Sequence, residues 1–278
     1  MSPTPPWLVP LERTRVTGPD DGGNHVSVAE LETPLSKEFE RQGTWLFRWR
    51  SYVPFPLLLF LIGWVYLFPS ANENPLLHLG WQAFCLGVGL VGIAVRAWVV
   101  GSVPTRTSGR NTRRQKASRL NTSGPYSLVR HPLYVGNFLL WIGIGAFCQS
   151  ILLVLITLGY FWIVYERFMV TVERFLLSSF GEEYRKWASV TPAVIPDFSH
   201  WMAQSLPFSW QVAVRREYAA LYGLVSVLFV LDLVEGTAIS GWPYIDPLWM
   251  PLMAGTTVLY LLIRFLRRRT SLFDVPER

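Results

Sequence analysis

Charged residues are scarce in this chain, and so are the residues that build most metal sites. Asp, Glu, Lys and Arg make up 16% of the 278 residues, and there are only 2 cysteines and 4 histidines. A soluble domain carries about 25% charged residues, so the balance favours a membrane protein. No Cys/His group has metal-ligand spacing, and no glycine-rich phosphate loop is present. The sequence therefore predicts no metal site, and it favours buried thiols over a disulfide.

The first 44 residues lack any apolar periodicity. They contain proline, glycine and charges of both signs, without the basic start and apolar middle of a signal peptide. We expect residues 1–44 to be mobile or only loosely attached.

Long apolar runs are abundant, and they predict an all-α, polytopic membrane protein. A bilayer core about 30 Å thick requires roughly 20 apolar residues as a helix. Six segments approach this length: 52–69, 80–100, 133–147, 150–165, 218–234 and 248–266. Only Cys148 and Gln149 separate the third from the fourth, which predicts a tight helical hairpin.

The distribution of Lys and Arg predicts the orientation of these segments. Residues 101–130 are rich in Arg and contain no acid, whereas 70–79, 148–149 and 235–247 contain no Lys or Arg. Basic loops stay in the cytoplasm, so we expect about six transmembrane helices with both termini cytoplasmic, in a bacterial inner membrane or the endoplasmic reticulum. The basic loops could also bind anionic lipid headgroups. No nucleic-acid recognition module is present.

The stretch 124–137, GPYSLVRHPLYVGN, is the first candidate site. Pro132 suits the first turn of a helix, and His131 then lies at its cap, where free N–H groups attract anions. Arg130 adds a charge, Tyr134 projects near the same helix end, and Gly136 leaves room for a ligand or another backbone. An aromatic interface anchor explains the stretch equally well.

The second candidate site is 165–196, where the fourth apolar segment continues into a charged helix. Glu173 and Arg174 follow Glu166 and Arg167 by two helical turns, so both glutamates lie on nearly one face. We expect Gly181 to end this helix. The alternative is a cytoplasmic-face amphipathic helix with surface ion pairs. The hairpin would bring both candidate sites together at one membrane face.

These two motifs resemble the isoprenylcysteine carboxyl methyltransferase and phospholipid methyltransferase superfamily over residues of about 80–196. The resemblance implies a membrane-embedded enzyme that uses S-adenosylmethionine, with a core at 45–196 and an extension at 197–278 that holds the last two spans. The cofactor-binding residues that it implies are Arg130, His131, Tyr134, Gly136, Glu173 and Tyr184. Family members commonly have two adjacent glutamates where this chain has Val172 and Glu173.

Three arginines near the expected cytoplasmic face are candidates for the catalytic, anion-holding role: Arg96, Arg167 and Arg174. An anionic nucleophile requires cations and no general base, so we expect the substrate to be a carboxylate or phosphate on a membrane amphiphile. Snorkelling to the interface is the alternative for these side chains. A phospholipid amine methyltransferase, a nicotinamide-dependent membrane reductase and a silent scaffold also remain open. The sequence specifies neither the acceptor nor the oligomeric state.

Overall fold

The part of the chain that the computed structural model describes, residues 34–70, 74–104, 119–204, 206–273 and 275, is helical and contains no strand. Its α-helices are α1 (Pro34–Arg48), α2 (Pro54–Leu67), α3 (Pro75–Ser102), α4 (Pro125–Leu128), α5 (Pro132–Phe147), α6 (Ile151–Phe180), α7 (Glu182–Val190), α8 (Trp210–Ser240) and α9 (Trp249–Arg269). A short 3-10 turn, Phe198–His200, follows α7.

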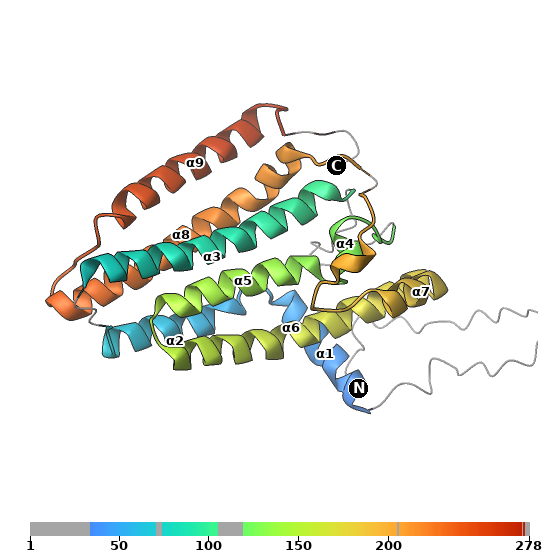
Figure 1. Ribbon diagram of the computed structural model, residues 1–278, viewed down its shortest axis with the longest axis horizontal. Coiled ribbons are helices and arrows are strands. Elements are labelled where there is room, and N and C mark those ends of the chain that lie inside the picture. Colours follow the sequence, from blue (N-terminus) through green and yellow to red (C-terminus); the bar gives the residue numbers. More distant parts are fainter. Residues whose placement is uncertain (1–33, 71–73, 105–118, 205, 274, 276–278) are drawn as a thin grey trace, which may run out of the picture.

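Six of these helices form an elongated bundle, in which helices consecutive along the chain run in opposite directions (Figure 1). Each of the six predicted apolar segments is helical. Four helices, α3, α6, α8 and α9, are long and apolar enough to cross a membrane. The other two, α2 and α5, are apolar but have only 14 and 16 residues, so six membrane crossings stay a prediction.

The bundle has two ends of different composition. At the end that we call the His131 end, α3, α6 and α9 finish and α2, α5 and α8 begin (Figure 1, right). The opposite end, called the His78 end, holds the short connections after α2, α5 and α8 (Figure 1, left). The Arg-rich stretches of the sequence thus follow or precede helix ends at the His131 end, whereas the connections without Lys or Arg follow helices that finish at the other end; residues 105–118 lie outside the described part of the chain.

Local sequence explains where several helices begin and end. Proline occupies the first turn of α2, α3 and α5, where its missing N–H costs nothing. Asn74 caps α3 by accepting a hydrogen bond from Leu76 N–H at 3.0 Å. Gly181 ends α6 with a φ of +52°, as the sequence predicted. Between α5 and α6, Gln149 makes the tight hairpin turn with a φ of 51°.

Small residues allow α3 and α5 to approach closely. A Cβ added at Gly92 would lie 2.6 Å from the Gly136 carbonyl oxygen, and one added at Gly143 would lie 2.7 Å from the Cys85 carbonyl oxygen. A Cβ at Gly136 would lie 2.5 Å from Cγ of Arg96. Gly136, expected to leave room for a ligand or a backbone, therefore leaves room for α3 and for the Arg96 side chain.

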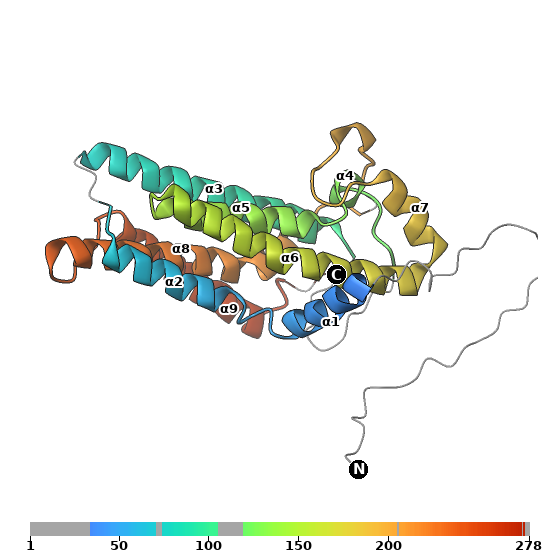
Figure 2. The same ribbon diagram turned by 90° about the horizontal axis from the view of Figure 1, so that it is seen from below.

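The N-terminal helix α1 packs against α6, as Figure 2 shows from below. A Cβ on Gly43 would lie 2.4 Å from the Arg167 carbonyl oxygen, and Phe47 contacts Phe168 edge-on at 5.9 Å. Residues 34–44, the last part of the segment expected to be mobile or loosely attached, thus lie in a helix that packs on α6; the expectation itself stays a prediction. Residues 1–33 lie outside the described residues.

The expected division at 196/197 is not a boundary in the packing. Helix α8, which belongs to the C-terminal extension, packs against α2, α3, α5 and α9. Its Leu224 and Leu228 are buried in the same apolar core as Leu61 of α2 and Cys85 of α3. The last two long helices are thus part of one bundle with the rest.

Candidate functional site

The two sequence motifs meet at the His131 end. Nε2 of His131 lies 3.0 Å from Oε1 of Glu173, and Nη1 of Arg130 lies 3.1 Å from the same oxygen. His131 is the N-cap residue of α5 and is 7% exposed, whereas Glu173 extends from α6. The α5–α6 hairpin brings these groups together across 42 residues of sequence, as expected.

Two buried donors in this cluster have no hydrogen-bond partner among the described residues. They are Nε of Arg130 and the hydroxyl of Tyr184. Buried polar groups in proteins are nearly always satisfied. The Tyr184 hydroxyl lies near enough to Glu173 and Arg130 to interact with both, but neither it nor Nε of Arg130 makes a hydrogen bond of normal geometry within the described residues. The backbone N–H of Arg130 donates to the Pro192 carbonyl at 2.8 Å, which ties the segment after α7 to the cluster.

Tyr184 comes from α7 and closes one side of the cluster. It is 5% exposed and packs against Trp187, with ring centroids 5.8 Å apart. Burial raises the pKa of Tyr184 to about 12; the Glu173 carboxylate adds to the rise, while Arg130 opposes it. The hydroxyl therefore keeps its proton at neutral pH and can act as a donor.

Aromatic rings line the other side of the cluster. The His131 ring stacks nearly parallel to Tyr134 at 5.4 Å, and Tyr134 contacts Tyr165 edge-on at 5.1 Å. Tyr165 also stacks on Phe161 at 3.8 Å. This row of rings connects the His131–Glu173 pair to the space between α6 and the start of α2.

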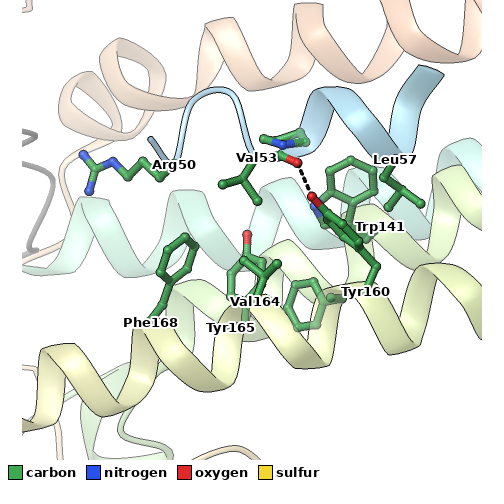
Figure 3. A pocket seen from close by; sticks show the side chains of 10 residues that line it. Arg50, Val53, Leu57, Trp141, Tyr160, Val164, Tyr165 and Phe168 are labelled. Carbon is green, nitrogen blue, oxygen red and sulfur yellow. Dashed lines mark hydrogen bonds between the residues drawn. The ribbon is translucent and has the colours of Figure 1, made fainter. Parts of the chain in front are cut away.

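A small cavity of about 30 Å³ lies at the end of that aromatic row (Figure 3). Its walls are mostly apolar and aromatic, and Arg50 lies at its edge. The Tyr160 hydroxyl donates to the Val53 carbonyl, which joins α6 to the start of α2 beside the cavity (Figure 3). The lining residues are Arg50, Val53, Pro54, Leu57, Trp141, Tyr160, Phe161, Val164, Tyr165 and Phe168.

The three arginines expected to hold an anion do not converge on His131. Nε of Arg96 donates to Oε2 of Glu217 at 2.8 Å, and its Nη1 bonds to Asn137. This ion pair joins α3 to α8, and Glu217 is only 3% exposed.

The other two arginines are held by α1. Nε of Arg167 donates to Gln42 at 2.8 Å, and Arg174 forms an ion pair with Glu40. The anion-holding roles of Arg96, Arg167 and Arg174 stay predictions. Sequence reasoning missed the partners of all three. Glu217 did carry a signal, because an acid beside the apolar run 218–234 requires a partner.

Comparison with known proteins points to one family. A model of the phospholipid methyltransferase family matches residues 78–183. This range includes Arg130, His131, Tyr134 and Glu173, and it ends one residue before Tyr184. No solved structure matches the chain.

Three curated proteins are similar to the chain. The cobalt-zinc-cadmium resistance protein CzcN of Cupriavidus metallidurans is 36% identical over 60% of this chain and 68% of its own length. The nickel-cobalt-cadmium resistance protein NccN of Alcaligenes xylosoxydans xylosoxydans is 32% identical over 58% of this chain and 73% of its own length. Protein-S-isoprenylcysteine O-methyltransferase of Schizosaccharomyces pombe is 34% identical over 31% of this chain and 36% of its own length.

The family match contains the first motif and the first part of the second, and four helices of the bundle have the length and composition of membrane spans. The resemblance seen in the sequence is thus confirmed: the chain belongs to the phospholipid methyltransferase family, in the membrane-embedded superfamily that includes the isoprenylcysteine methyltransferases.

Proposed function

We propose that this protein is an S-adenosylmethionine-dependent methyltransferase that acts on a carboxylate or phosphate of a membrane amphiphile. The observation that carries the proposal is the convergence of His131 and Arg130 on the Glu173 carboxylate, beside two buried donors without partners. Family membership supports the methyltransferase class, and the arginine-rich surroundings favour an anionic acceptor.

The chemistry of the cluster fits the cofactor. The start of α5 suits a carboxylate through the positive end of its helix dipole, and His131 makes no side-chain capping bond there. The orphan donors of Arg130 and Tyr184 would meet further acceptors, and Glu173 would pair with an ammonium group. The rings of Tyr134 and Tyr165 suit a sulfonium cation or a purine. When bound, S-adenosylmethionine would supply a methyl group on a good leaving group.

The protein's own task is then to place the acceptor and to exclude water. The cavity beside Tyr165 is too small for a lipid chain, but its apolar walls offer a starting contact for such a chain next to the aromatic row. Arg50 at its edge can face an anionic headgroup (Figure 3). Arg167 and Arg174 are further cations on the same helix as Glu173.

We also infer that the His131 end faces the cytoplasm and that all six helices of the bundle, α2, α3, α5, α6, α8 and α9, span the membrane. The support is the alternation of Arg-rich segments at the His131 end with connections free of Lys and Arg at the His78 end. Cysteine labelling from each side of sealed vesicles tests this orientation. A cysteine substituted for Pro243, in the connection between α8 and α9, should react only from the side opposite the cytoplasm. Its labelling from the cytoplasmic side would overturn the orientation.

Cofactor binding is the first test of the function. S-adenosylmethionine should raise the melting temperature of the purified full chain, whereas a nicotinamide dinucleotide should not. His131→Ala and Glu173→Gln should each abolish that shift. His200→Gln is the matched control, because His200 pairs with Asp197 at the same end but is exposed. Normal binding by Glu173→Gln would refute the assignment, and a shift with the dinucleotide alone would favour the reductase alternative.

The acceptor is tested with S-adenosylmethionine carrying a labelled methyl group and a total membrane lipid extract. We expect label in a base-labile ester or on a phosphate of an amphiphile, identified by mass spectrometry. Label on a phosphatidylethanolamine amine would replace the anionic acceptor with the amine alternative.

The names of two relatives favour a physiological role in tolerance to divalent transition metals. We propose that this chain contributes to such tolerance, as the curated names state for CzcN and NccN. Expression in a host that lacks its own relative should permit growth at higher cobalt, zinc or cadmium. If His131→Ala protects equally well, the methyltransferase site is not the source of the tolerance.

A further inference from the structure

A second group of ligand-type side chains lies at the His78 end, far from the cofactor cluster. His78 is in the first turn of α3, Asp232 is near the end of α8, and Asp246 is in the connection to α9. Each offers one ligand atom, and these atoms all lie within 4.8 Å of one another. His78 precedes Arg96 by 18 residues on α3, so at 1.5 Å per residue the two ends are about 27 Å apart.

Hydrogen bonding fixes the state of the His78 ring. The buried indole N–H of Trp249 can only donate, and it donates to Oε1 of Gln82 at 2.9 Å. The Gln82 amide nitrogen must therefore face the other way, and it lies 2.8 Å from Nε2 of His78 and 2.8 Å from Oδ1 of Asp232. An amide nitrogen only donates, so Nε2 of His78 presents a lone pair and carries no proton.

A neutral imidazole carries one N–H, so the proton belongs on Nδ1 when Nε2 accepts from Gln82. Nδ1 lies 3.0 Å from the side-chain amide nitrogen of Gln149, and with this tautomer the amide oxygen and nitrogen of Gln149 exchange places, so that the oxygen accepts from Nδ1. A metal-ligating histidine usually donates a hydrogen bond from one ring nitrogen to a protein acceptor, while the lone pair of the other nitrogen binds the metal.

Nε2 of His78, which accepts from the Gln82 amide, also lies close to a carboxylate. It is 3.5 Å from Oδ2 of Asp246, and with Nε2 unprotonated no hydrogen bond joins these two atoms. Two electron-rich atoms at this separation repel unless a cation lies between them. Two ligands bound tetrahedrally to zinc at 2.0–2.2 Å are about 3.4 Å apart. A metal ion would take over the lone pair and leave the Gln82 amide its bond to Asp232.

The charge at this end is negative and lacks basic compensation. Asp232 and Glu235, one turn apart on α8, are each 4% exposed, and Asp246 is close by. Residues 51–95, 131–166 and 217–263, which include the connections at this end, contain no Lys or Arg. Buried carboxylates without a cation are costly. His78 and Asp246 are 18% and 28% exposed, so an ion can reach the group from water.

We propose that His78, Asp232 and Asp246 form a binding site for one divalent transition-metal ion at the His78 end. One imidazole nitrogen and two carboxylate oxygens suit zinc or cobalt, whereas calcium and magnesium prefer oxygen ligands alone. Two carboxylates balance the charge of the ion. The site is separate from the cofactor cluster, so it does not depend on the methyltransferase proposal.

The test uses the full chain in lipid nanodiscs, without a polyhistidine tag, after chelator treatment and dialysis. Zn²⁺ should bind at one ion per chain, and Co²⁺ should give a visible absorption band that Zn²⁺ removes. His78→Gln and Asp246→Asn should each weaken binding at least tenfold. Asp246 is partly exposed, so its substitution is the safer variant for folding, and helical circular dichroism checks both.

His200→Gln is the matched control, since it removes a histidine beside an aspartate at the opposite end. It should leave Zn²⁺ and Co²⁺ binding unchanged. Absence of stoichiometric binding by the wild type would overturn the proposal. Unchanged binding in Asp246→Asn, or an equal loss in His200→Gln, would also overturn it, because the ions would then be bound elsewhere. S-adenosylmethionine binding, measured separately, reports on the other site.

Discussion

Helix α8 buries a glutamate near each of its ends, and the two carboxylates have different hydrogen-bond partners. At the His131 end, Glu217 is 3% exposed and accepts a hydrogen bond from the Arg96 guanidinium. At the His78 end, Glu235 is 4% exposed and accepts one from the backbone N–H of Ser70 at 3.1 Å. The same residue type, equally buried in one helix, has a cation as its partner at one end and a neutral donor at the other.

This difference separates two ways of burying charge. A fixed arginine makes a carboxylate part of the framework, since removal of one partner leaves the other charge stranded. A carboxylate held only by neutral donors keeps its negative potential for an ion from outside. The first end thus compensates its buried charge with an arginine, whereas the second has the uncompensated carboxylates that the proposed cation site requires.

Glu217→Gln should have the largest effect on stability, because it strands the buried Arg96 charge. We expect a loss of about 3–5 kcal/mol in the free energy of unfolding, measured by equilibrium unfolding in mixed micelles. The double variant Arg96→Gln/Glu217→Gln should recover most of this loss. A cost below about 1 kcal/mol for Glu217→Gln would mean that the ion pair is not part of the framework.

Gly136→Ala should destabilise the His131 end by overpacking the contact between α3 and α5. The added methyl group would lie 2.5 Å from Cγ of Arg96 and 2.8 Å from the Gly92 carbonyl oxygen. We expect a loss of about 1–3 kcal/mol, typical of overpacking. Gly87→Ala is the control on α3, since nothing lies within 4 Å of a Cβ there. Equal effects of the two variants would contradict close packing at Gly136.

Glu235→Gln is the matched partner of Glu217→Gln and should cost little. The new amide keeps an oxygen for the Ser70 N–H and strands no cation, so we expect a change within about 1 kcal/mol in metal-free protein. The same unfolding assay measures it. If Glu235→Gln lowers the free energy of unfolding as much as Glu217→Gln does, the two ends do not differ in how they stabilise a buried carboxylate.

Tyr184→Phe should have the smallest effect on stability, since its hydroxyl has no partner among the described residues. We expect a cost below about 1 kcal/mol, together with weaker binding of S-adenosylmethionine, measured by thermal shift. If the wild type and Tyr184→Phe bind S-adenosylmethionine equally well, the Tyr184 hydroxyl does not contact the cofactor.

The same variant has a signature at high pH. The folded pKa of Tyr184, about 12, lies above the usual value of 10. Its contribution to stability is therefore complete below pH 10 and is lost as the pH rises from 10 to about 12. The free energy of unfolding, measured from pH 10 to about 12, should fall less steeply with pH in Tyr184→Phe than in the wild type. If the two curves are parallel, Tyr184 does not have the raised pKa.

The sequence was sufficient for the local features and for one long-range contact. The six apolar segments of the sequence predicted the positions of the six bundle helices, and Gly181 predicted the end of α6. The contact between His131 and Glu173 was predictable because a connection of three residues forces α5 and α6 to pack side by side. Residues matched to a known family added the roles that geometry alone does not assign.

The remaining contacts depend on how distant helices pack, which sequence spacing does not encode. Arg96 and Glu217 are 121 residues apart, and nothing local distinguishes this pairing from snorkelling. The ligand-type atoms of His78, Asp232 and Asp246 belong to three segments, so no metal-binding spacing appears along the chain. Helix α1 is amphipathic over 34–48, a pattern that the polar composition of the preceding residues concealed, and its contacts with α6 are partly polar, such as Arg167 with Gln42.

The ion pair between Glu40 and Arg174 has a consequence for substrate entry. Glu40 is itself a carboxylate, and it already occupies a guanidinium proposed to receive a carboxylate or phosphate. A substrate that uses Arg174 must therefore compete with an anion carried by the protein, and its apparent affinity falls by the fraction of molecules in which α1 stays docked. The N-terminal helix would then act as a built-in competitive inhibitor, whose strength sets the substrate concentration at which the enzyme begins to work.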